Sequence, residues 1–152
     1  MKVLCLALFF ALFAASCQKE TPQTLNCAAG YEGNQCDSLI VAKYLGTYFA
    51  RDNSPTRGIS EYVVQIVPYE GKIDQCYINQ LTCGQNCIPH NLVARLLPNN
   101  QFELLRVQAF PYTFEGVEKG TYYPQTATIA FNYQIRYENG TTEIVKTELI
   151  KQ

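Results

Sequence analysis

The sequence contains no tryptophan and a single histidine among its 152 residues. Because histidine is the usual proton shuttle near neutral pH, one histidine leaves little room for acid–base catalysis. An excess of charge is also missing, since 12 Lys and Arg oppose 13 Asp and Glu. A chain without a basic surface does not hold a phosphate backbone, so nucleic acid is not an expected partner. Gly-rich phosphate loops and the Ser elbow of hydrolases are absent as well.

The sequence also lacks an apolar run long enough to cross a bilayer. Its longest run, Val3 to Ala15, has thirteen residues. As a helix, such a run would span roughly 20 Å, less than the ~30 Å of a hydrocarbon core. It follows the basic start Met1-Lys2 and ends at the small residue Ser16. This arrangement predicts a signal peptide over residues 1–16.

The end of this run resembles a lipid-attachment site. Ala14-Ala15-Ser16-Cys17 is similar to the lipobox of bacterial lipoproteins, which implies that Cys17 is acylated and becomes the first residue of the mature chain. Buried acyl chains would then hold the protein on a membrane. The alternative is ordinary secretion with a free Cys17 thiol. Residues 17–26 are polar and predict a tether, in which Gln18-Lys19-Glu20 is either a solvated linker or similar to a lipoprotein export signal.

A short cysteine-bounded segment follows the tether. Residues 27–37 include the spacing C-x-x-G-Y-x-G-x-x-C, which resembles the closing half of an EGF-like module. The resemblance implies a disulfide between Cys27 and Cys36, with Gly30 and Gly33 turning the chain at positive φ. We interpret this hairpin as a structural spacer, with a recognition role as the alternative. The earlier cysteines of a full EGF-like module are absent, so calcium binding is not carried over.

Residues 38–152 show short apolar and aromatic runs separated by turns. Expected strands cover residues 62–67, 75–81, 92–97, 102–107, 126–137 and 142–150. Pro98-Asn99-Asn100 predicts one hairpin turn, and Asn139-Gly140 predicts another of type I′. Helical structure is expected only as a turn within residues 39–45. This pattern predicts an all-β domain, an antiparallel barrel of six to eight strands, with a β-sandwich as the alternative.

Over most of its length the chain resembles small Gram-negative surface lipoproteins with a C-terminal lipocalin-like, or calycin-like, domain. The resemblance rests on the lipobox, the cysteine hairpin, Lys43–Tyr48, the segment Tyr112–Gly116 and the closing Asn-Gly hairpin. It implies an outer-membrane lipoprotein, and it makes Tyr112–Gly116 a strand. Gly46-Thr47-Tyr48 is similar to the Gly-x-Trp of the first lipocalin strand. In lipocalins that Trp packs under a basic residue of the last strand, for which Arg136 and Lys146 are the candidates.

The remaining cysteines offer one cluster with ligand-type side chains. Cys76, Cys83, Cys87 and His90 have the spacing C-x6-C-x3-C-x2-H. In a compartment that permits disulfides we expect one pair among Cys76, Cys83 and Cys87, and the spacing does not decide which pair forms. A zinc site with His90 is the alternative. A Cys87 nucleophile with His90 as base, and carboxylates among Glu103, Glu115 and Glu118, are weaker candidates for chemistry. We therefore expect no enzyme activity and no cofactor.

Aromatic side chains are the main argument for binding. Tyrosine offers an apolar face and a polar tip, which suit a small ligand at the mouth of a barrel. The candidate contacts lie in or near aromatic segments that contain proline: Tyr112, Phe114, Tyr122 and Tyr123. Strand aromatics such as Phe131 and Tyr133 are instead expected to face the core. Asp37-Ser38-Leu39 resembles a bacterial O-glycosylation site at Ser38.

Taken together, these patterns predict a lipid-anchored envelope protein whose β domain binds a small ligand or an envelope partner. The first alternative is a structural or interaction protein with a filled barrel. A filled barrel has no internal cavity, whereas an open one has a pocket of roughly 300–1,000 Å³ lined by Tyr and Phe. The second alternative is an envelope zinc or thiol protein that uses Cys76, Cys83, Cys87 and His90.

Overall fold

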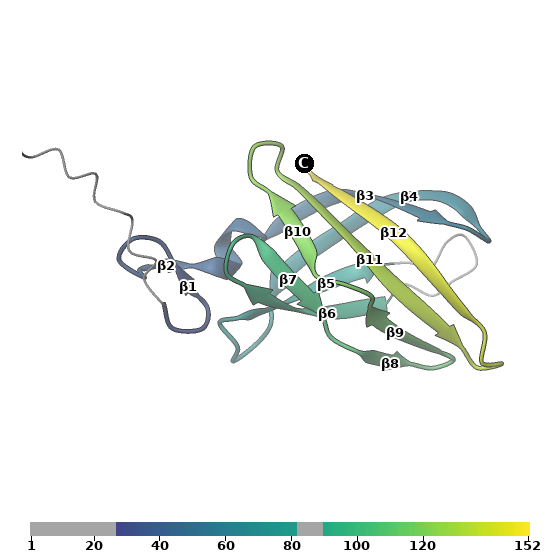
Figure 1. Ribbon diagram of the computed structural model, residues 1–152. Helices are drawn as coiled ribbons and strands as arrows, with labels where there is room; N and C mark the ends of the chain where they lie inside the picture. The colour runs from purple at the N-terminus through teal and green to yellow at the C-terminus, as the bar shows by residue number, and fades with distance from the viewer. Residues whose placement is uncertain (1–26, 82–89) are drawn as a thin grey trace, which may run out of the picture.

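A computed structural model describes residues 27–81 and 90–152, and shows a β-barrel with a small two-stranded unit at one end (Figure 1). The elements of the small unit and its connection to the barrel are β1 (Tyr31–Glu32), β2 (Ser38–Leu39) and the 3-10 helix η1 (Ile40–Lys43). The barrel sheet consists of β3 (Gly46–Ser54), β4 (Gly58–Pro68), β5 (Gln75–Leu81), β6 (His90–Leu97), β7 (Gln101–Leu104), β8 (Val107–Ala109), β9 (Tyr112–Gly116), β10 (Gly120–Tyr123), β11 (Thr128–Tyr137) and β12 (Thr142–Lys151). No helix in these described residues is long and apolar enough to cross a bilayer.

Eight antiparallel strands close the barrel in the order β3-β4-β5-β6-β7-β10-β11-β12. Closure depends on β11. One edge of β11 pairs with β12, and its other edge is divided between two strands. Its first residues pair with β10, and residues 133–137 pair with β9. β8 pairs only with β9, so these two strands form a flap at one end of the barrel. The predicted all-β barrel is therefore confirmed, and the sandwich alternative is wrong.

The core fills the inside of the barrel, because side chains along each strand alternate between its two faces. On β11, Phe131, Tyr133 and Ile135 point inward and are at most 4% exposed. Tyr48 and Leu149 are inward positions on β3 and β12 with no exposed surface. The expectation that alternating aromatics face the core is confirmed. Burial of this apolar and aromatic surface is the main stabilising contribution to the fold.

One end of the barrel, here called the tether end, is covered by η1 and the residues beside it. Tyr44 follows η1 and is 1% exposed, and its carbonyl accepts a hydrogen bond from the Tyr48 hydroxyl (2.8 Å). The Lys151 ammonium lies 5.8 Å from the centre of the Tyr48 ring. The basic residue over this aromatic is thus Lys151. Arg136 and Lys146 were the wrong candidates, because both occupy outward positions of their strands.

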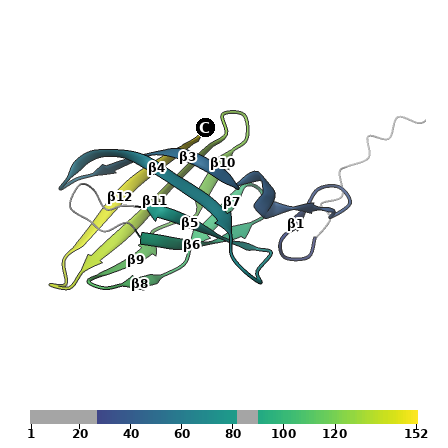
Figure 2. The same ribbon diagram turned by 180° about the vertical axis from the view of Figure 1, so that it is seen from behind.

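The disulfide hairpin is docked on the tether end (Figures 1 and 2). Cys27 and Cys36 are bridged as predicted, and Gly30 and Gly33 take φ values of 88° and 96°. Lys43 links the hairpin to the barrel, because its ammonium contacts Glu32 (2.6 Å) and the side-chain oxygen of Asn100 (2.8 Å). Since β2 pairs with β1, the hairpin unit includes Ser38 and Leu39, two residues beyond the expected boundary at 37.

The structure corrects two local expectations. The run 102–107 is not one strand, because the chain leaves β6 after Leu104 and re-forms as β8 against β9. The Asn139-Gly140 turn is not of type I′. Gly140 N–H donates to the Tyr137 carbonyl, Tyr137 N–H donates to the Thr141 carbonyl, and within this loop only Gly140 has a positive φ. This is a three-residue loop with a bulge at glycine, in which the Asn139 side chain accepts a bond from Thr141 N–H.

The strands at 75–81 and 112–116 have the expected bounds, and the others differ from expectation at one or both ends. The expected hairpin turn at Pro98-Asn99-Asn100 connects β6 to β7, with Asn99 and Asn100 in the left-handed region that asparagine tolerates. The predicted signal peptide, Cys17 and the tether all fall within residues 1–26. They lie outside the described residues and remain predictions.

Candidate binding site

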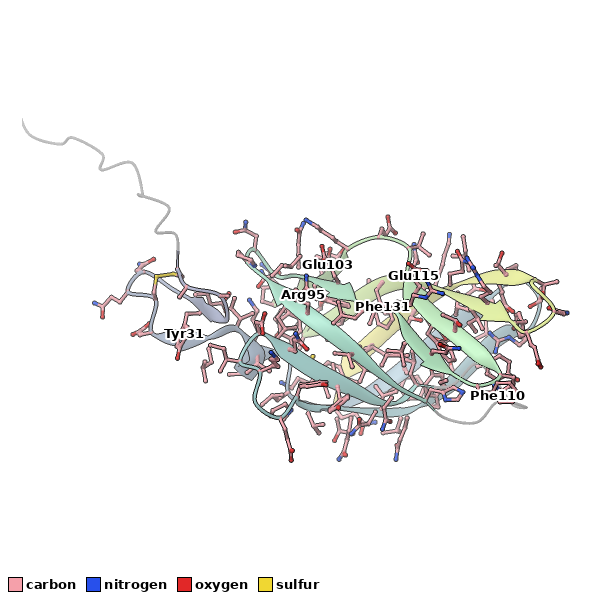
Figure 3. All side chains as sticks on the ribbon, turned by 90° about the horizontal axis from the view of Figure 1, so that it is seen from below. Tyr31, Arg95, Glu103, Phe110, Glu115 and Phe131 are labelled. Carbon is pink, nitrogen blue, oxygen red and sulfur yellow. A yellow bond between two sulfur atoms is a disulfide. The ribbon has the colours of Figure 1, made fainter. Side chains whose placement is uncertain are left out.

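Several loops meet at the end of the barrel that lies away from the disulfide hairpin (Figures 1 and 2). These loops connect β3 to β4, β8 to β9, and β11 to β12. We call this the tip end. Figure 3 labels Phe110 there, at the opposite end of the molecule from Tyr31 of the disulfide hairpin. A ligand at the tip end would therefore lie away from the predicted tether.

A buried glutamate organises the loops at the tip end. Glu143 is an inward position of β12 and is 5% exposed. Its carboxylate accepts hydrogen bonds from the Arg57 guanidinium (3.0 Å), the Tyr137 hydroxyl (2.7 Å) and the Ser54 hydroxyl. Burial raises the pKa of Glu143, but these hydrogen bonds outweigh it and lower the pKa to about 2. The carboxylate is therefore charged at neutral pH, and it joins the β3–β4 and β11–β12 hairpins.

A second carboxylate lies deeper in the barrel. Asp52 is 3% exposed and accepts hydrogen bonds from Tyr62 (2.6 Å), Tyr133 (2.8 Å) and Thr147 (2.6 Å). All three donors are hydroxyl groups, which supply no full positive charge. Burial therefore prevails over these bonds and raises the pKa of Asp52 above its ordinary value. The two carboxylates thus differ in pKa. Arg57 contacts Glu143, and it also lowers the pKa of Asp52, but there desolvation is the larger effect.

The sequence carries a signal for the burial of both carboxylates. Asp52 continues the inward series of Tyr48 and Ala50, and Glu143 begins the inward series of Val145 and Leu149. Side chains two residues apart on a strand lie on the same face. A carboxylate that alternates in phase with the apolar residues of the inner face is therefore buried with them. This pattern identifies the burial of Asp52 and Glu143, although it does not identify their partners.

A pocket of about 450 Å³ opens at the rim of the tip end, and we call it the rim pocket. Its lining comes from the start of β9 and from the end of β11 with the following loop: Pro111, Tyr112, Tyr137, Glu138 and Asn139. Register explains why these residues meet, since Tyr112 pairs directly with Tyr137. Their ring centroids are 5.5 Å apart and their planes are almost perpendicular, at 89°. Among the lining residues only Glu138 carries a formal charge.

His90 lies behind the rim pocket. Its ring packs against Phe114, with centroids 4.9 Å apart, and against Tyr112 at 5.9 Å. Its Nε2 is buried and has no hydrogen-bond partner among the residues that the structure describes. Burial lowers the pKa of His90, so the imidazole is neutral at neutral pH. The single histidine of the chain therefore supports the Tyr112 ring and brings no positive charge to the site.

The four predicted ligand contacts do not share one site. Tyr112 lines the rim pocket, and Phe114 is buried just inside it at 1% exposure. Tyr122 points inward at the tether end, where its ring lies 5.3 Å from that of Tyr44. Tyr123 points outward and is 48% exposed. Tyr137 and Glu138 were not predicted as site residues, because only the pairing of β9 with β11 brings them beside Tyr112.

The structure separates the predicted zinc ligands. Cys76 lies opposite Ala94 in the β5–β6 pair, and His90 precedes Ala94 by four residues. At about 3.3 Å per residue the two backbones are about 13 Å apart, whereas ligand atoms on one zinc ion lie within about 4 Å of each other. Cys76 and His90 therefore cannot hold the same ion. Cys76 is a free, buried thiol whose pKa burial raises to about 12, and Cys83 and Cys87 lie outside the described residues.

The remaining candidate residues lie on the surface. Ser38 is exposed in β2, and O-glycosylation there stays a prediction. The three glutamates considered for catalysis, Glu103, Glu115 and Glu118, line an open pocket of about 340 Å³ together with Arg106 and Lys119. Figure 3 labels Glu103 and Arg95, whose charged atoms are 3.8 Å apart. The basic neighbours offset the carboxylates, and the site stays open to solvent.

The barrel interior is filled around its central residues. Tyr133, Ile135 and Val145 have no accessible surface, so no void large enough for water touches them. Aromatic rings follow one another from Tyr44 at the tether end through Phe102, Phe131 and Tyr133 to Phe114 at the tip end. A large ligand therefore has no room among these residues, whereas the rim pocket is an aromatic site that stays open to solvent.

No protein-family model matches the sequence, and no curated protein sequence matches it. Solved structures do match the fold. A redesigned β-barrel shares 10% identity over 74% of this chain and 95% of its own, with a TM-score of 0.50. EF1p2_mFAP2b bound to DFHBI shares 15% identity over 74% of this chain and 98% of its own, with a TM-score of 0.56. A Bacteroides ovatus protein of unknown function shares 12% identity over 71% of this chain and 41% of its own, with a TM-score of 0.50. At these identities the likeness shows a closed antiparallel β-barrel.

Proposed function

We propose that this chain is a lipid-anchored protein of the bacterial envelope that binds a small ligand at the rim pocket of its β-barrel. One observation carries the binding proposal: Tyr112 and Tyr137 form an accessible corner beside a charged side chain in a pocket of about 450 Å³. Small-ligand sites typically combine such an apolar, aromatic wall with a few polar groups. The neighbouring barrel EF1p2_mFAP2b is bound to DFHBI, which is compatible with this proposal.

The site is supported from beneath by buried groups. The Tyr137 hydroxyl donates to Glu143, which in turn accepts from Arg57, so the orientation of this ring is tied to two hairpins. Tyr112 is held from behind by the His90 ring. Aromatic walls whose positions are fixed in advance lose little conformational freedom on binding, which favours affinity. Neutral His90 and fully paired Glu143 are therefore positioning residues for the two tyrosines.

The lipid anchor is proposed from the sequence alone, on the lipobox-like Ala14-Ala15-Ser16-Cys17. The same segment, together with the barrel, supports the proposal that this chain is a Gram-negative lipoprotein with a calycin-like domain. Labelling a Gram-negative host with alkyne-palmitate tests the anchor. The wild-type chain should incorporate the label and sediment with membranes. Cys17→Ala should lose the label, whereas equal labelling of both chains would reject Cys17 as the acylation site.

Ligand binding is tested with the full chain in a non-ionic detergent. Saturation-transfer NMR is recorded with four probes of different chemistry: choline, N-acetylglucosamine, indole and hexanoate. We expect at least one probe to receive magnetisation from the wild-type protein and to lose it with Tyr112→Leu. Tyr123→Leu is the matched control, because Tyr123 at the end of β10 is 48% exposed and is not part of the pocket lining. If every probe behaved alike with Tyr112→Leu and the wild type, the rim pocket would not be a ligand site.

The filled barrel favours a second candidate, a structural or interaction protein of the envelope. The side chains without accessible surface at the centre of the barrel are the observation behind it. In that case the rim pocket has no occupant of its own. None of the four probes would then bind, although Cys17→Ala would still release the chain from the membrane.

A further inference from the structure

The two tyrosines of the rim pocket form a corner of perpendicular rings. Their planes meet at 89°, and both rings line the same open space. The face of an aromatic ring carries the negative part of its quadrupole. A positive group in the corner would meet this negative potential from two directions at once. A neutral ring-shaped ligand could stack on only one of the two planes at a time.

The charges near the corner have the sign that complements a cation. Glu138 is exposed, is the one charged lining residue, and contributes a negative charge. Glu143 lies beneath Tyr137, and its charge is offset by Arg57. His90 behind Tyr112 is neutral at neutral pH. The formal charge of the described lining is therefore negative, which disfavours an anionic ligand.

The surroundings of the pocket also suit the apolar substituents of an organic cation. Pro111 lines one wall, and Phe110 beside it is 79% exposed. Figure 3 shows Phe110 projecting at the tip end of the molecule. An inorganic cation keeps its hydration shell and prefers several carboxylate or carbonyl oxygens, whereas Glu138 is the one carboxylate among the described lining residues. A methylated or alkylated ammonium is weakly hydrated and matches an aromatic wall.

We propose that the rim pocket binds an organic ammonium group in the corner between Tyr112 and Tyr137, with Glu138 as its counter-charge. This inference rests on the proposed function, because it names the ligand class of that site. The ammonium group belongs either to a soluble amine or to the headgroup of a membrane lipid. Both sources present the same positive group, and they differ in the phosphate that accompanies a headgroup.

The first test compares choline with 3,3-dimethylbutan-1-ol, which has the same shape without the charge. Both are titrated into the full, ¹⁵N-labelled chain in non-ionic detergent, and amide shifts of residues 110–112 and 137–139 are followed. We expect choline to saturate these shifts in the millimolar range and the neutral alcohol to bind at least about tenfold more weakly. Phosphocholine then separates the two sources. Equal or tighter binding than choline indicates a lipid headgroup, and weaker binding indicates a soluble amine.

Three variants test the contacts. Glu138→Gln should weaken choline binding about threefold to tenfold, because it removes the counter-charge from an exposed site without touching the core. Tyr112→Leu should weaken it by a similar or larger factor, and Tyr112→Phe should restore it because the ring face is kept. Glu70→Gln, the same change in the β4–β5 turn, is the control and should leave the affinity unchanged.

The outcomes distinguish this inference from the proposed function. Equal binding of choline and its neutral isostere, both lost with Tyr112→Leu, would overturn the ammonium proposal and keep the rim pocket as a ligand site. An unchanged choline affinity in Glu138→Gln would overturn the role of the counter-charge. Choline shifts that are absent, or that lie away from residues 110–112 and 137–139, would reject the ammonium proposal. The other three probes would then test whether the rim pocket binds any ligand.

Discussion

Two buried carboxylates dominate the electrostatics at the level of single residues. Glu143 has a guanidinium partner and a pKa lowered to about 2, whereas Asp52 is bonded by hydroxyl groups and has a raised pKa. Linkage therefore gives the two groups opposite effects on stability as the pH changes. The contrast follows from the partners and from depth, because Asp52 lies deeper in the barrel and loses more hydration than Glu143.

Replacing Glu143 tests its stabilising contribution. Its pKa is lower in the folded than in the unfolded chain, so its contribution is complete above about pH 4.3 and is lost as the pH falls towards 2. We expect Glu143→Gln to reduce the free energy of unfolding by about 3 kcal/mol at pH 7. Urea unfolding followed by circular dichroism measures the loss. Glu138→Gln, at an exposed position, is the control and should change stability by less than about 0.5 kcal/mol. A loss that persisted undiminished at pH 2 would contradict the assignment.

Asp52 should give the reverse dependence on pH. Because its folded pKa is raised, its contribution is complete below the unfolded value of about 3.9 and is lost as the pH rises through the folded pKa. The stability of the wild-type chain should therefore fall relative to that of Asp52→Asn as the pH rises above 4. The same unfolding measurement from pH 4 to pH 8 checks this. Parallel stability curves for the two proteins would show that Asp52 does not titrate differently on folding.

At the level of elements, the sequence predicted what depends on local pattern and missed what depends on pairing. The alternation of apolar and polar residues predicted most strands and the inward orientation of Phe131 and Tyr133. It could not give the division of one edge of β11 between β9 and β10, because that pairing is set by contacts distant in sequence. The same pairing brings Tyr137 beside Tyr112. For this reason one half of the rim pocket was predicted from sequence and the other half was not.

Closure of the barrel between β7 and β10 depends on a close approach. An added Cβ at Gly120 would overlap the Phe102 ring, and Gly120 pairs directly with Phe102 in the sheet. We expect Gly120→Ala to lower the free energy of unfolding by about 1–3 kcal/mol through this overpacking. Gln125→Ala, in the exposed loop that follows β10, should have little effect. Combining Gly120→Ala with Phe102→Leu should cost less than the sum of the two changes, and simple additivity would argue against the clash.

The attachment of the disulfide hairpin to the barrel depends on Lys43. Its contacts with Glu32 and Asn100 join the hairpin, η1 and the β6–β7 turn. Lys43→Met should raise the ps–ns mobility of residues 27–39 with little change in global stability, because the Gly30 to Ile40 hydrogen bond and the disulfide remain. Amide relaxation of the full chain measures this. Lys146→Met on the outer face of β12 is the control, and an equally rigid hairpin in Lys43→Met would show that Lys43 is not the attachment.

For the whole molecule, the arrangement separates the predicted anchor from the proposed site. The chain enters the barrel through the disulfide hairpin at the tether end, and the rim pocket lies at the tip end (Figure 1). The filled centre of the barrel lies between them. A protein tethered by Cys17 would thus present its pocket away from the membrane surface, to the space in which soluble or exposed ligands are found.

The proposed function depends on ligand binding at the rim pocket of this barrel. The most direct measurement is a map of amide chemical shifts for the full chain in non-ionic detergent, recorded with each of the four probes. We expect saturable shifts concentrated at residues 110–112 and 137–139, with smaller changes at His90 and Glu143. Shifts concentrated instead at the outer-face pocket of Arg51 and Lys146, or no saturable shift with any probe, would contradict it.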